Sequence, residues 1–600
     1  MSGAPAPATV VATLAARRER RGWILFAIAA IVTLAFPLAM PLQAYHLNIL
    51  MQASTYAIAV FGLTIVLGYA GQINLAQAAF FGIGAYSVAL GTATYAMSFW
   101  VALAIGTAFA AVAGAALGLT SLRLGGHYLA MVTISFQTIL SLVLANWVSF
   151  TRGPDGVTGI QRPSILGHPI ADSSHYLVLC IVALYIVGYL VWRLGHSPLG
   201  RSMQAVRDNE LAAGVVGVNA YATKVIAFTL SAVLGGFGGG LFAGGFAYVS
   251  PDQFSFNESV VFLTMALLGG VRSPFGAALG TALLILLPES LRFLKAVYLA
   301  VYGCAVILIM VFMPEGIWGW FSALKRRLRP VQPVVNDAAP PLPLTSRTAQ
   351  AGDAVLLEVK TLSKHFGGLK AVDQVSFTVR ANTVHALIGP NGSGKTTLLN
   401  VLSGIYVPTG GEMIFEHRQI TRLKPHERAA NGIGRTFQNI RLFTAMSVID
   451  NVIVGAQRHG NEVEGGDAGR RDLALAALGF VGLASRALDS VQGLSYGHQR
   501  LVEIARALAG NPRMLLLDEP GAGLNHHEKQ ELVGLLKRLR GHGLTIFIID
   551  HDMNLVEQLA DHITVLNFGR RIADGAPAEV LRHPEVIKAY LGEEAHRAVA

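Results

Sequence analysis

Long apolar runs follow one another through the first 324 residues of the sequence. The first of them, Trp23 to Met40, contains no charged residue. About 20 consecutive apolar residues allow a helix to cross the hydrocarbon core of a bilayer, whereas a charge at its centre costs about 2.5–3.5 kcal/mol. Charged residues make up only 14% of the 600-residue chain, while soluble proteins carry about 25%. This part of the chain is therefore predicted to lie in lipid.

We predict about ten membrane-spanning helices in the segment 23–324, which gives a polytopic all-α membrane domain. Small residues let such helices approach closely, so the glycine-rich run Leu234–Gly245 is interpreted as a packing surface rather than a pore lining. Cys180 and Cys304 are interpreted as buried small apolar residues. The predicted spans begin near Trp23, His46, Leu75, Phe99, Tyr128, His175, Val225, Ser259, Phe275 and Ala296.

The basic residues predict the orientation of these spans, because lysine and arginine collect in cytoplasmic loops. The cluster Arg17–Arg21 places the tail 1–22 in the cytoplasm, and ten crossings return the chain there. Topology thus accounts for much of the net charge of +10, and no nucleic-acid partner is expected. Arg292 and Lys295 would lie outside, against the rule. Basic residues that agree with the cytoplasmic side are Arg123, Arg193, Arg201, Arg207, Arg272, Lys325, Arg326, Arg327 and Arg329.

One cytoplasmic connection, residues 197–224, is long and charged. Its middle has helical periodicity, which indicates either an ordinary amphipathic loop or a helix that docks on another domain. The outer loop Thr151–Ile160 has turn chemistry and is a candidate contact for an external partner. The apolar positions of the cytoplasmic connection are Met203, Val206, Leu211, Val215 and Val216.

The segment 325–353 is rich in proline and poor in large apolar residues, so it is predicted to be a cytoplasmic linker. The region 354–600 that follows is dense in charge and has only short apolar runs. This pattern is typical of a soluble α/β domain.

The segment VHALIGPNGSGKTTLLNVLSG contains a phosphate-binding loop. Strand 384–388 precedes the loop and helix 397–404 follows it, in the order that the G-x-x-x-x-G-K-[ST] motif requires. The glycines let main-chain N–H groups surround phosphate oxygens, and the helix N-terminus adds positive potential. We predict that Lys395 reaches the β- and γ-phosphates and that Thr396 binds Mg²⁺. The predicted nucleotide-binding residues here are Gly389, Pro390, Asn391, Gly392, Ser393, Gly394, Lys395, Thr396 and Thr397.

Two acidic residues follow a second buried strand, Met514–Leu517. An acid at the carboxyl end of a parallel strand meets the metal beside the phosphate-binding loop. Asp518 is therefore a predicted Mg²⁺ ligand, and Glu519 is the candidate general base for the attacking water.

The region 354–600 resembles an ABC ATPase, because LSYGHQRLVEIARAL (Leu494–Leu508) is similar to the signature motif LSGGQ and its helix. Tyr496 and His498 depart from that pattern, whereas Ser495 and Gly497 keep it. The resemblance implies an α/β P-loop ATPase with ATP and Mg²⁺ as cofactors. It gives Phe366 as the adenine-stacking residue, Gln438 as the Q-loop residue and metal ligand, Gly521–Asn525 as the D-loop and His551 as the switch histidine. Catalysis is thereby expected from Glu519, His551 and Gln438.

The segments GRTFQNIRLF, DEPGAGLN and VIKAYLGEE resemble the G-type ATPase of branched-chain amino-acid (Liv-type) importers. The segments Leu67–Tyr86, 151–160, 197–219 and Leu263–Gly280 resemble the M-type permease of the same systems. The resemblance implies a permease fused to its ATPase in the bacterial inner membrane, with both termini cytoplasmic. Residues in the cytoplasmic connection that are similar to the importer coupling sequence are Glu210, Ala212, Ala213 and Gly217.

In such a family, ATP lies between two ATPase domains, so Ser495 and Gly497 are expected to act on the nucleotide of the partner domain. The expected assembly holds an H-type permease, an F-type ATPase and a periplasmic substrate-binding protein; a homodimer is the alternative. Branched-chain or related hydrophobic amino acids are the expected cargo. Urea, short amides and aromatic acids remain alternatives, as do an ABC exporter or lipid-handling protein and a signalling ATPase without transport.

Overall fold

The computed structural model describes residues 33–35, 37, 43–121, 126–165, 168–293, 298–328, 354–457 and 465–590. The chain divides into two compact units. The first comprises Met1–Arg207 and Ala220–Val331, and the second comprises Asp208–Asn219 and Gln332–Ala600. Outside the described residues lie the predicted cytoplasmic tail, most of the first predicted span, and residues 329–353 of the predicted linker.

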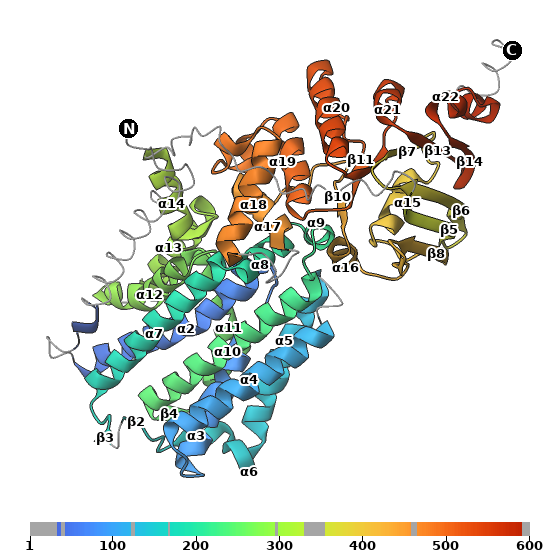
Figure 1. Cartoon of the computed structure of the whole chain (residues 1–600). Coiled ribbons are helices and arrows are strands. Elements are labelled where there is room, and N and C mark those ends of the chain that lie inside the picture. Colours follow the sequence, from blue (N-terminus) through green and yellow to red (C-terminus); the bar gives the residue numbers. More distant parts are fainter. Residues whose placement is uncertain are drawn as a thin grey trace. The chain divides into compact units, whose positions relative to one another are not determined.

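The first unit is helical, apart from short two-stranded pairings in its loops (Figure 1). One of these joins β1 (Val157–Thr158) to β4 (Tyr248–Val249) in antiparallel register. The helices are α2 (Ala44–Leu63), η1 (Thr64–Tyr69), α3 (Gln77–Ala93), α4 (Phe99–Ser121), α5 (Gly126–Asn146), α6 (Val148–Thr151), α7 (Ser173–His196), α8 (Pro198–Asp208), α10 (Ala220–Phe246), α11 (Phe256–Gly269), α12 (Pro274–Ser290), α13 (Tyr298–Phe312) and α14 (Gly316–Leu328).

Nine of the ten predicted spans are helices in the described chain, and the one that begins at Trp23 lies mostly outside it. Five of the described helices are long and apolar enough to cross a membrane, or seven spans if each of two bent pairs counts as one. The pair α11–α12 bends by 120°, so two predicted spans form one broken span or a re-entrant loop. The described helices therefore do not give a count of ten separate crossings.

Glycines in α3 and α10 bring the two helices into backbone contact. A Cβ atom at Gly84 would lie 1.8 Å from the carbonyl oxygen of Gly236, and one at Gly239 would lie 1.8 Å from that of Phe81. Neither position has room for a side chain, because both obstacles are main-chain atoms. The glycine-rich run is thus a packing surface at these positions.

The N-terminus of α3 is buried inside the first unit, where its N–H groups need partners. Side chains supply them: Ser259 Oγ accepts the N–H of Ala78 at 3.0 Å, and Gln137 Oε1 accepts that of Ala79 at 2.7 Å. These two donors at the start of the helix are therefore satisfied within the apolar interior.

The second unit contains two sheets (Figure 1). The six-stranded sheet has the order β10-β11-β12-β7-β13-β14 and is parallel except for the antiparallel edge strand β14; the other, antiparallel sheet has the order β6-β5-β8-β9. The strands are β5 (Val355–Phe366), β6 (Leu369–Arg380), β7 (Val384–Ile388), β8 (Gly410–Phe415), β9 (Arg418–Gln419), β10 (Ile433–Arg435), β11 (Met514–Asp518), β12 (Thr545–Ile549), β13 (His562–Asn567) and β14 (Arg570–Gly575).

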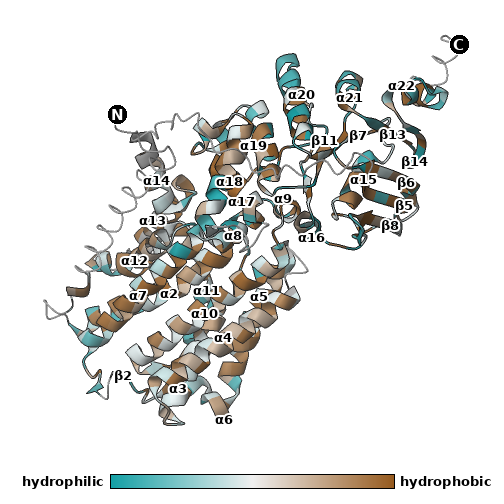
Figure 2. Cartoon of the chain, in the orientation of Figure 1, coloured by the Kyte–Doolittle hydropathy of each residue, from teal (hydrophilic) through white to brown (hydrophobic). Residues whose placement is uncertain are grey.

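Buried apolar strands form the centre of the second unit. Every residue of β7, β11 and β12 is buried, as expected for parallel strands that are covered on both faces. Figure 2 shows the contrast with the hydrophilic surface helix α20. The helices are α9 (Glu210–Val215), α15 (Lys395–Leu402), α16 (Pro425–Ala430), α17 (Val448–Ala456), α18 (Gly466–Phe480), α19 (Tyr496–Ala509), α20 (His526–Gly541), α21 (Met553–Leu559) and α22 (Pro577–Val580).

One sequence prediction about burial is wrong. Cys180 is buried, but Cys304 is exposed, because α13 leaves apolar side chains such as Ile307 and Leu308 without protein cover. The cytoplasmic connection breaks at Asn209 into α8 and α9 rather than continuing as one helix, and Leu211 at the start of α9 is 46% exposed.

Candidate nucleotide site

The phosphate-binding loop joins β7 to α15, in the predicted order. Gly389, Gly392 and Gly394 have φ angles of +151°, +79° and +98°, which residues other than glycine rarely adopt. A Cβ atom at Gly394 would also lie 2.2 Å from the carbonyl oxygen of Ala371. These glycines are therefore required by the backbone path. Among the remaining loop residues, Pro390 is partly exposed, Asn391 and Thr396 are exposed, Ser393 is buried and Thr397 is partly exposed.

Lys395 is folded back onto its own loop. Its Nζ donates hydrogen bonds to the carbonyl oxygens of Gly389 at 2.7 Å and Pro390 at 2.9 Å. Burial lowers the pKa of Lys395, and the nearby carboxylates of Glu519 and Asp518 oppose that shift. The ammonium group thus lies beside the predicted site with carbonyl partners that a phosphate could replace.

Asp518 ends β11 and is 3% exposed. Its Oδ2 lies 3.6 Å from Arg435 Nη2, whereas its buried Oδ1 has no hydrogen-bond partner in the described chain. Burial raises the pKa of Asp518 to about 6. A carboxylate with one unsatisfied oxygen fits the hard, oxygen-seeking character of Mg²⁺.

Gln438, Glu519 and His551 converge, although Gln438 and His551 are 113 positions apart in the chain. Gln438 Nε2 donates a hydrogen bond to Glu519 Oε2 at 3.0 Å. His551 Nδ1 lies 3.4 Å from the same oxygen. The three residues predicted to act in catalysis thus share one carboxylate oxygen.

The backbone at Glu519 is strained, with a φ of +43°. Such a conformation costs of the order of 1–3 kcal/mol for a residue other than glycine. The N–H of Glu519 donates to the carbonyl oxygen of Ile549 at 2.8 Å. The neighbouring strand β12 therefore holds the main chain of Glu519 at the carboxyl end of β11.

The signature segment begins α19. Ser495 is the N-cap, and its hydroxyl accepts the N–H of His498 at 3.4 Å. A Cβ atom at Gly497 would lie 2.5 Å from Glu528 Oε1, and one at Gly523 of the D-loop segment would lie 3.0 Å from the Tyr496 ring. The signature therefore packs against the D-loop and α20 of the same unit. Within the described chain, no hydrogen bond joins Ser495 or Gly497 to the phosphate-binding loop.

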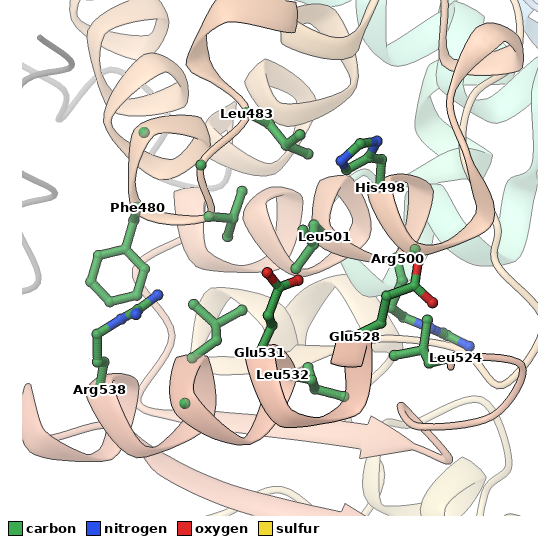
Figure 3. A pocket seen from close by; sticks show the side chains of 16 residues that line it. Phe480, Leu483, His498, Arg500, Leu501, Leu524, Glu528, Glu531, Leu532 and Arg538 are labelled. Carbon is green, nitrogen blue, oxygen red and sulfur yellow. The ribbon is translucent and has the colours of Figure 1, made fainter. Parts of the chain in front are cut away.

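A cavity of about 600 Å³ lies beside this packing, between α18, α19 and α20. Figure 3 shows Phe480 and Arg538 at one end and His498 and Arg500 towards the other. The Arg538 guanidinium lies 5.8 Å from the Phe480 ring centroid. Polar and charged side chains line much of the cavity, which therefore differs from an apolar ligand pocket.

Phe366 ends β5 and is 42% exposed. Its ring packs edge-on against Tyr406 at 5.3 Å between centroids, and Lys364 Nζ lies 4.9 Å from its centroid. The ring is thus accessible, and its stacking on adenine stays a prediction.

Sequence reasoning missed a buried charge network in α19. Glu503 is fully buried between Arg500 and Arg506, with its carboxylate 3.0 Å and 3.5 Å from their guanidinium groups. Arg500 also donates to the carbonyl oxygen of Gln438 at 2.7 Å, and Arg506 to that of Arg441 at 2.8 Å. The sequence signal was three charges at i, i+3 and i+6 within Arg500–Ala509, a stretch of α19 that is otherwise apolar. They hold the main chain of the Q-loop.

The segment 208–219 belongs to the second unit. Within that unit α9 packs on α16, and Asp208 Oδ2 accepts the N–H of Ala445 at 2.9 Å. Asn209 caps α9 by accepting the N–H of Ala212 at 2.9 Å. This supports a docking helix over an ordinary amphipathic loop.

Family models match three parts of the chain. Residues 45–313 match the permease component of branched-chain amino-acid transport systems, and residues 372–522 match the ABC transporter model. Residues 570–596 match a model described as branched-chain amino acid ATP-binding cassette transporter.

Curated relatives match each half separately. The branched-chain amino acid transport ATP-binding protein BraF of Pseudomonas aeruginosa is 43% identical over 40% of this chain and 98% of that protein. LivG of Escherichia coli K12, also an ATP-binding protein, is 42% identical over 40% of this chain and 98% of that protein. The permease protein LivM of the same strain is 34% identical over 44% of this chain and 67% of that protein.

A helical permease segment followed by an ABC-type P-loop ATPase segment defines an ABC transporter, in which an ATPase is coupled to transport. Within that class, the chain belongs to the branched-chain amino-acid transport family, and it carries M-type permease and G-type ATP-binding parts on one polypeptide.

Proposed function

We propose that this protein is the fused permease and ATPase of an importer for branched-chain or related hydrophobic amino acids. The observation that carries the proposal is that both halves independently match relatives named for branched-chain amino-acid transport. The ATPase half supplies the driving force, and the permease half supplies the path. A bacterial inner membrane with a cytoplasmic ATPase and cytoplasmic termini is the corresponding location.

In the proposed site, the loop Gly389–Thr397 binds the phosphates of ATP, and Phe366 stacks on the adenine. Thr396, Gln438 and Asp518 hold Mg²⁺, which neutralises charge on the phosphates when bound. Glu519 accepts a proton from the attacking water, a role worth about 10²–10⁴ in rate. His551 contacts the γ-phosphate.

Ser495 and Gly497 are proposed to act on the nucleotide of a second ATPase domain. Their lack of hydrogen bonds to the phosphate-binding loop within the described chain is compatible with this. A chain with half of each site needs a partner, and we propose an H-type permease, an F-type ATPase and an external binding protein. The mass of the purified active complex tests this assembly, and an active particle of this polypeptide alone would establish the homodimer instead.

Segment 208–219 is the proposed route from nucleotide to membrane. ATP can drive the transport cycle only if its affinity differs between two states of the protein. Because the segment is covalently continuous with the first unit yet belongs to the second, a change at the nucleotide can reach the permease through it.

Uptake into proteoliposomes tests the function. Labelled leucine, urea and benzoate are offered to the protein with its co-purifying partners and binding protein, beside a Glu519→Gln variant. We expect ATP-dependent leucine uptake that the substitution abolishes. Uptake of urea or benzoate alone would replace the cargo, whereas ATP hydrolysis without any uptake would favour an exporter or a signalling ATPase.

A further inference from the structure

The main-chain N–H of Gly389, the first residue of the phosphate-binding loop, has a side-chain partner from the C-terminal segment. It donates a 2.7 Å hydrogen bond to the hydroxyl oxygen of Tyr590. The two residues are 201 positions apart. None of the nucleotide-binding motifs described above includes Tyr590.

Gly389 needs such a partner because it lies where the sheet ends. Strand β7 pairs with β12 up to Leu387 and with β13 up to Ile388. At Gly389 the chain turns out of both ladders with a φ of +151°, yet the residue is buried. A buried N–H without an acceptor carries a substantial free-energy penalty.

The helical segment 584–590 presents the tyrosine to this position. Val586 is 3% exposed and belongs to the core of the second unit. Tyr590 follows it by four residues, so both side chains lie on one face of the helix. Tyr590 as a whole is 38% exposed, and partial burial raises its pKa to about 12. A tyrosine hydroxyl is neutral at pH 7 even at its ordinary pKa of about 10.

The carbonyl group of Gly389 contacts the proposed nucleotide site, because its oxygen accepts a hydrogen bond from Lys395 Nζ at 2.7 Å. Tyr590 thus holds one peptide group of Gly389, and the adjoining peptide group contacts the phosphate-binding lysine. The orientation of this residue affects both the path of the loop and the resting position of the lysine.

We propose that Tyr590 is a positioning residue for nucleotide binding, which fixes Gly389 so that the loop is in its binding shape before ATP arrives. This rests on the proposed ATP site at Gly389–Thr397. Without the hydroxyl, the N–H of Gly389 turns towards another acceptor, and only a fraction of molecules holds a competent loop. The apparent dissociation constant rises by the inverse of that fraction.

The test is Tyr590→Phe in the full-length chain purified with its partner subunits, with Glu585→Gln as the matched control on an exposed position of the same helix. Binding of a fluorescent ATP analogue and ATP hydrolysis are measured on both. We expect the dissociation constant and KM for ATP to rise about three- to thirtyfold in Tyr590→Phe. The value of kcat at saturating ATP should stay within twofold, and Glu585→Gln should match the wild type.

Hydrogen exchange gives a second measurement that does not depend on activity. The peptide spanning 384–394 should exchange faster in Tyr590→Phe than in the wild type, because the Gly389 amide loses its acceptor. A lower melting temperature with unchanged affinity and unchanged exchange would mean that Tyr590 only packs, and would overturn the proposal.

A Lys395→Ala variant separates this inference from the proposed site itself. If Lys395→Ala loses nucleotide binding while Tyr590→Phe binds like the wild type, only the role of Tyr590 is rejected. If Lys395→Ala binds nucleotide normally, the proposed ATP site is rejected, and the inference with it.

Discussion

The amide of Gln438 donates a hydrogen bond to the carboxylate of Glu519 at 3.0 Å. The same Glu519 oxygen lies 3.4 Å from His551 Nδ1. One oxygen therefore joins the Q-loop, the end of β11 and the end of β12. Displacement of any of the three by a bound nucleotide would alter the surroundings of the other two, which is what a site that both senses and hydrolyses ATP requires.

Substitution of Glu519 by glutamine removes the proposed general base but keeps the size of the side chain and its carbonyl acceptor for Gln438. We expect ATP hydrolysis to fall about 10²–10⁴-fold while nucleotide binding persists. Phosphate release and binding of a fluorescent ATP analogue measure the two effects. Glu531→Gln, at an exposed position on α20, is the control. Hydrolysis within tenfold of the wild type would reject Glu519 as the base.

Substitution of Arg500 by methionine breaks the buried network in α19 and leaves Glu503 with one guanidinium. Loss of one partner of a buried ion pair costs about 3–5 kcal/mol, so the melting temperature of the ATPase transition should fall by about 6–20 °C. Arg486→Met, on a side chain that is 44% exposed, should change it little. Calorimetry in detergent measures both melting temperatures. Equal shifts would show that the buried network stabilises the ATPase no more than an exposed ion pair does.

Acid should destabilise the second unit through His385, which is 1% exposed and bonded to Thr564 Oγ1 at 2.9 Å. Burial, and then the charge of His562, lower its pKa from 6.5 to about 3, against the opposing effect of Asp574. The unfolded chain takes up a proton below pH 6.5 that the folded chain refuses until about pH 3. Stability is therefore present above pH 6.5 and is lost as the pH falls.

At pH 5 this loss amounts to about 2 kcal/mol, since each pKa unit corresponds to about 1.4 kcal/mol. Thermal unfolding at pH 7.5 and pH 5.0 measures it. His385→Phe keeps the ring packing with Phe547 and should show a smaller difference between the two pH values, whereas the exposed control His526→Gln should not. The same pH difference in His385→Phe and the wild type would contradict the assignment.

Substitution of Gly84 by alanine should disrupt the first unit, because the added Cβ meets the Gly236 carbonyl oxygen at 1.8 Å. Overpacking of this kind costs about 1–3 kcal/mol. Gly303→Ala is the matched control in α13, where nothing lies within 4 Å of the new atom. The yield of monodisperse protein and its melting temperature compare the two. Similar behaviour of both variants would mean that α3 and α10 can separate without penalty.

Substitution of Asp208 by alanine removes the acceptor of the Ala445 N–H. A hydrogen bond to a charged group contributes about 1.5–3 kcal/mol. We expect uptake to fall several-fold while ATP hydrolysis without substrate stays within twofold. Asp208→Asn keeps an acceptor oxygen and should retain most of the uptake. Proteoliposome assays decide, and parallel loss of hydrolysis and uptake would point to a defect in the ATPase itself.

The sequence alone determined the parts of this protein that depend on neighbouring residues. Apolar runs predicted nine helices that the structure describes, because lipid-facing helices are selected by local composition. The motif Gly389–Thr396 predicted strand, loop and helix, because its glycine positions require special φ angles. Asp518 and Glu519 were predicted to be site residues because they follow a buried strand.

Only the tertiary structure decided which distant residues meet. Glu519 lies beside His551 because β11 pairs with β12 in a register that sets Asp518 opposite Ile549, and no local pattern specifies the neighbour of a strand. The bend between α11 and α12, the Arg500–Glu503 network and the contact of Tyr590 with Gly389 have the same origin. Each depends on packing between segments far apart in the chain, whereas composition and spacing describe one segment at a time.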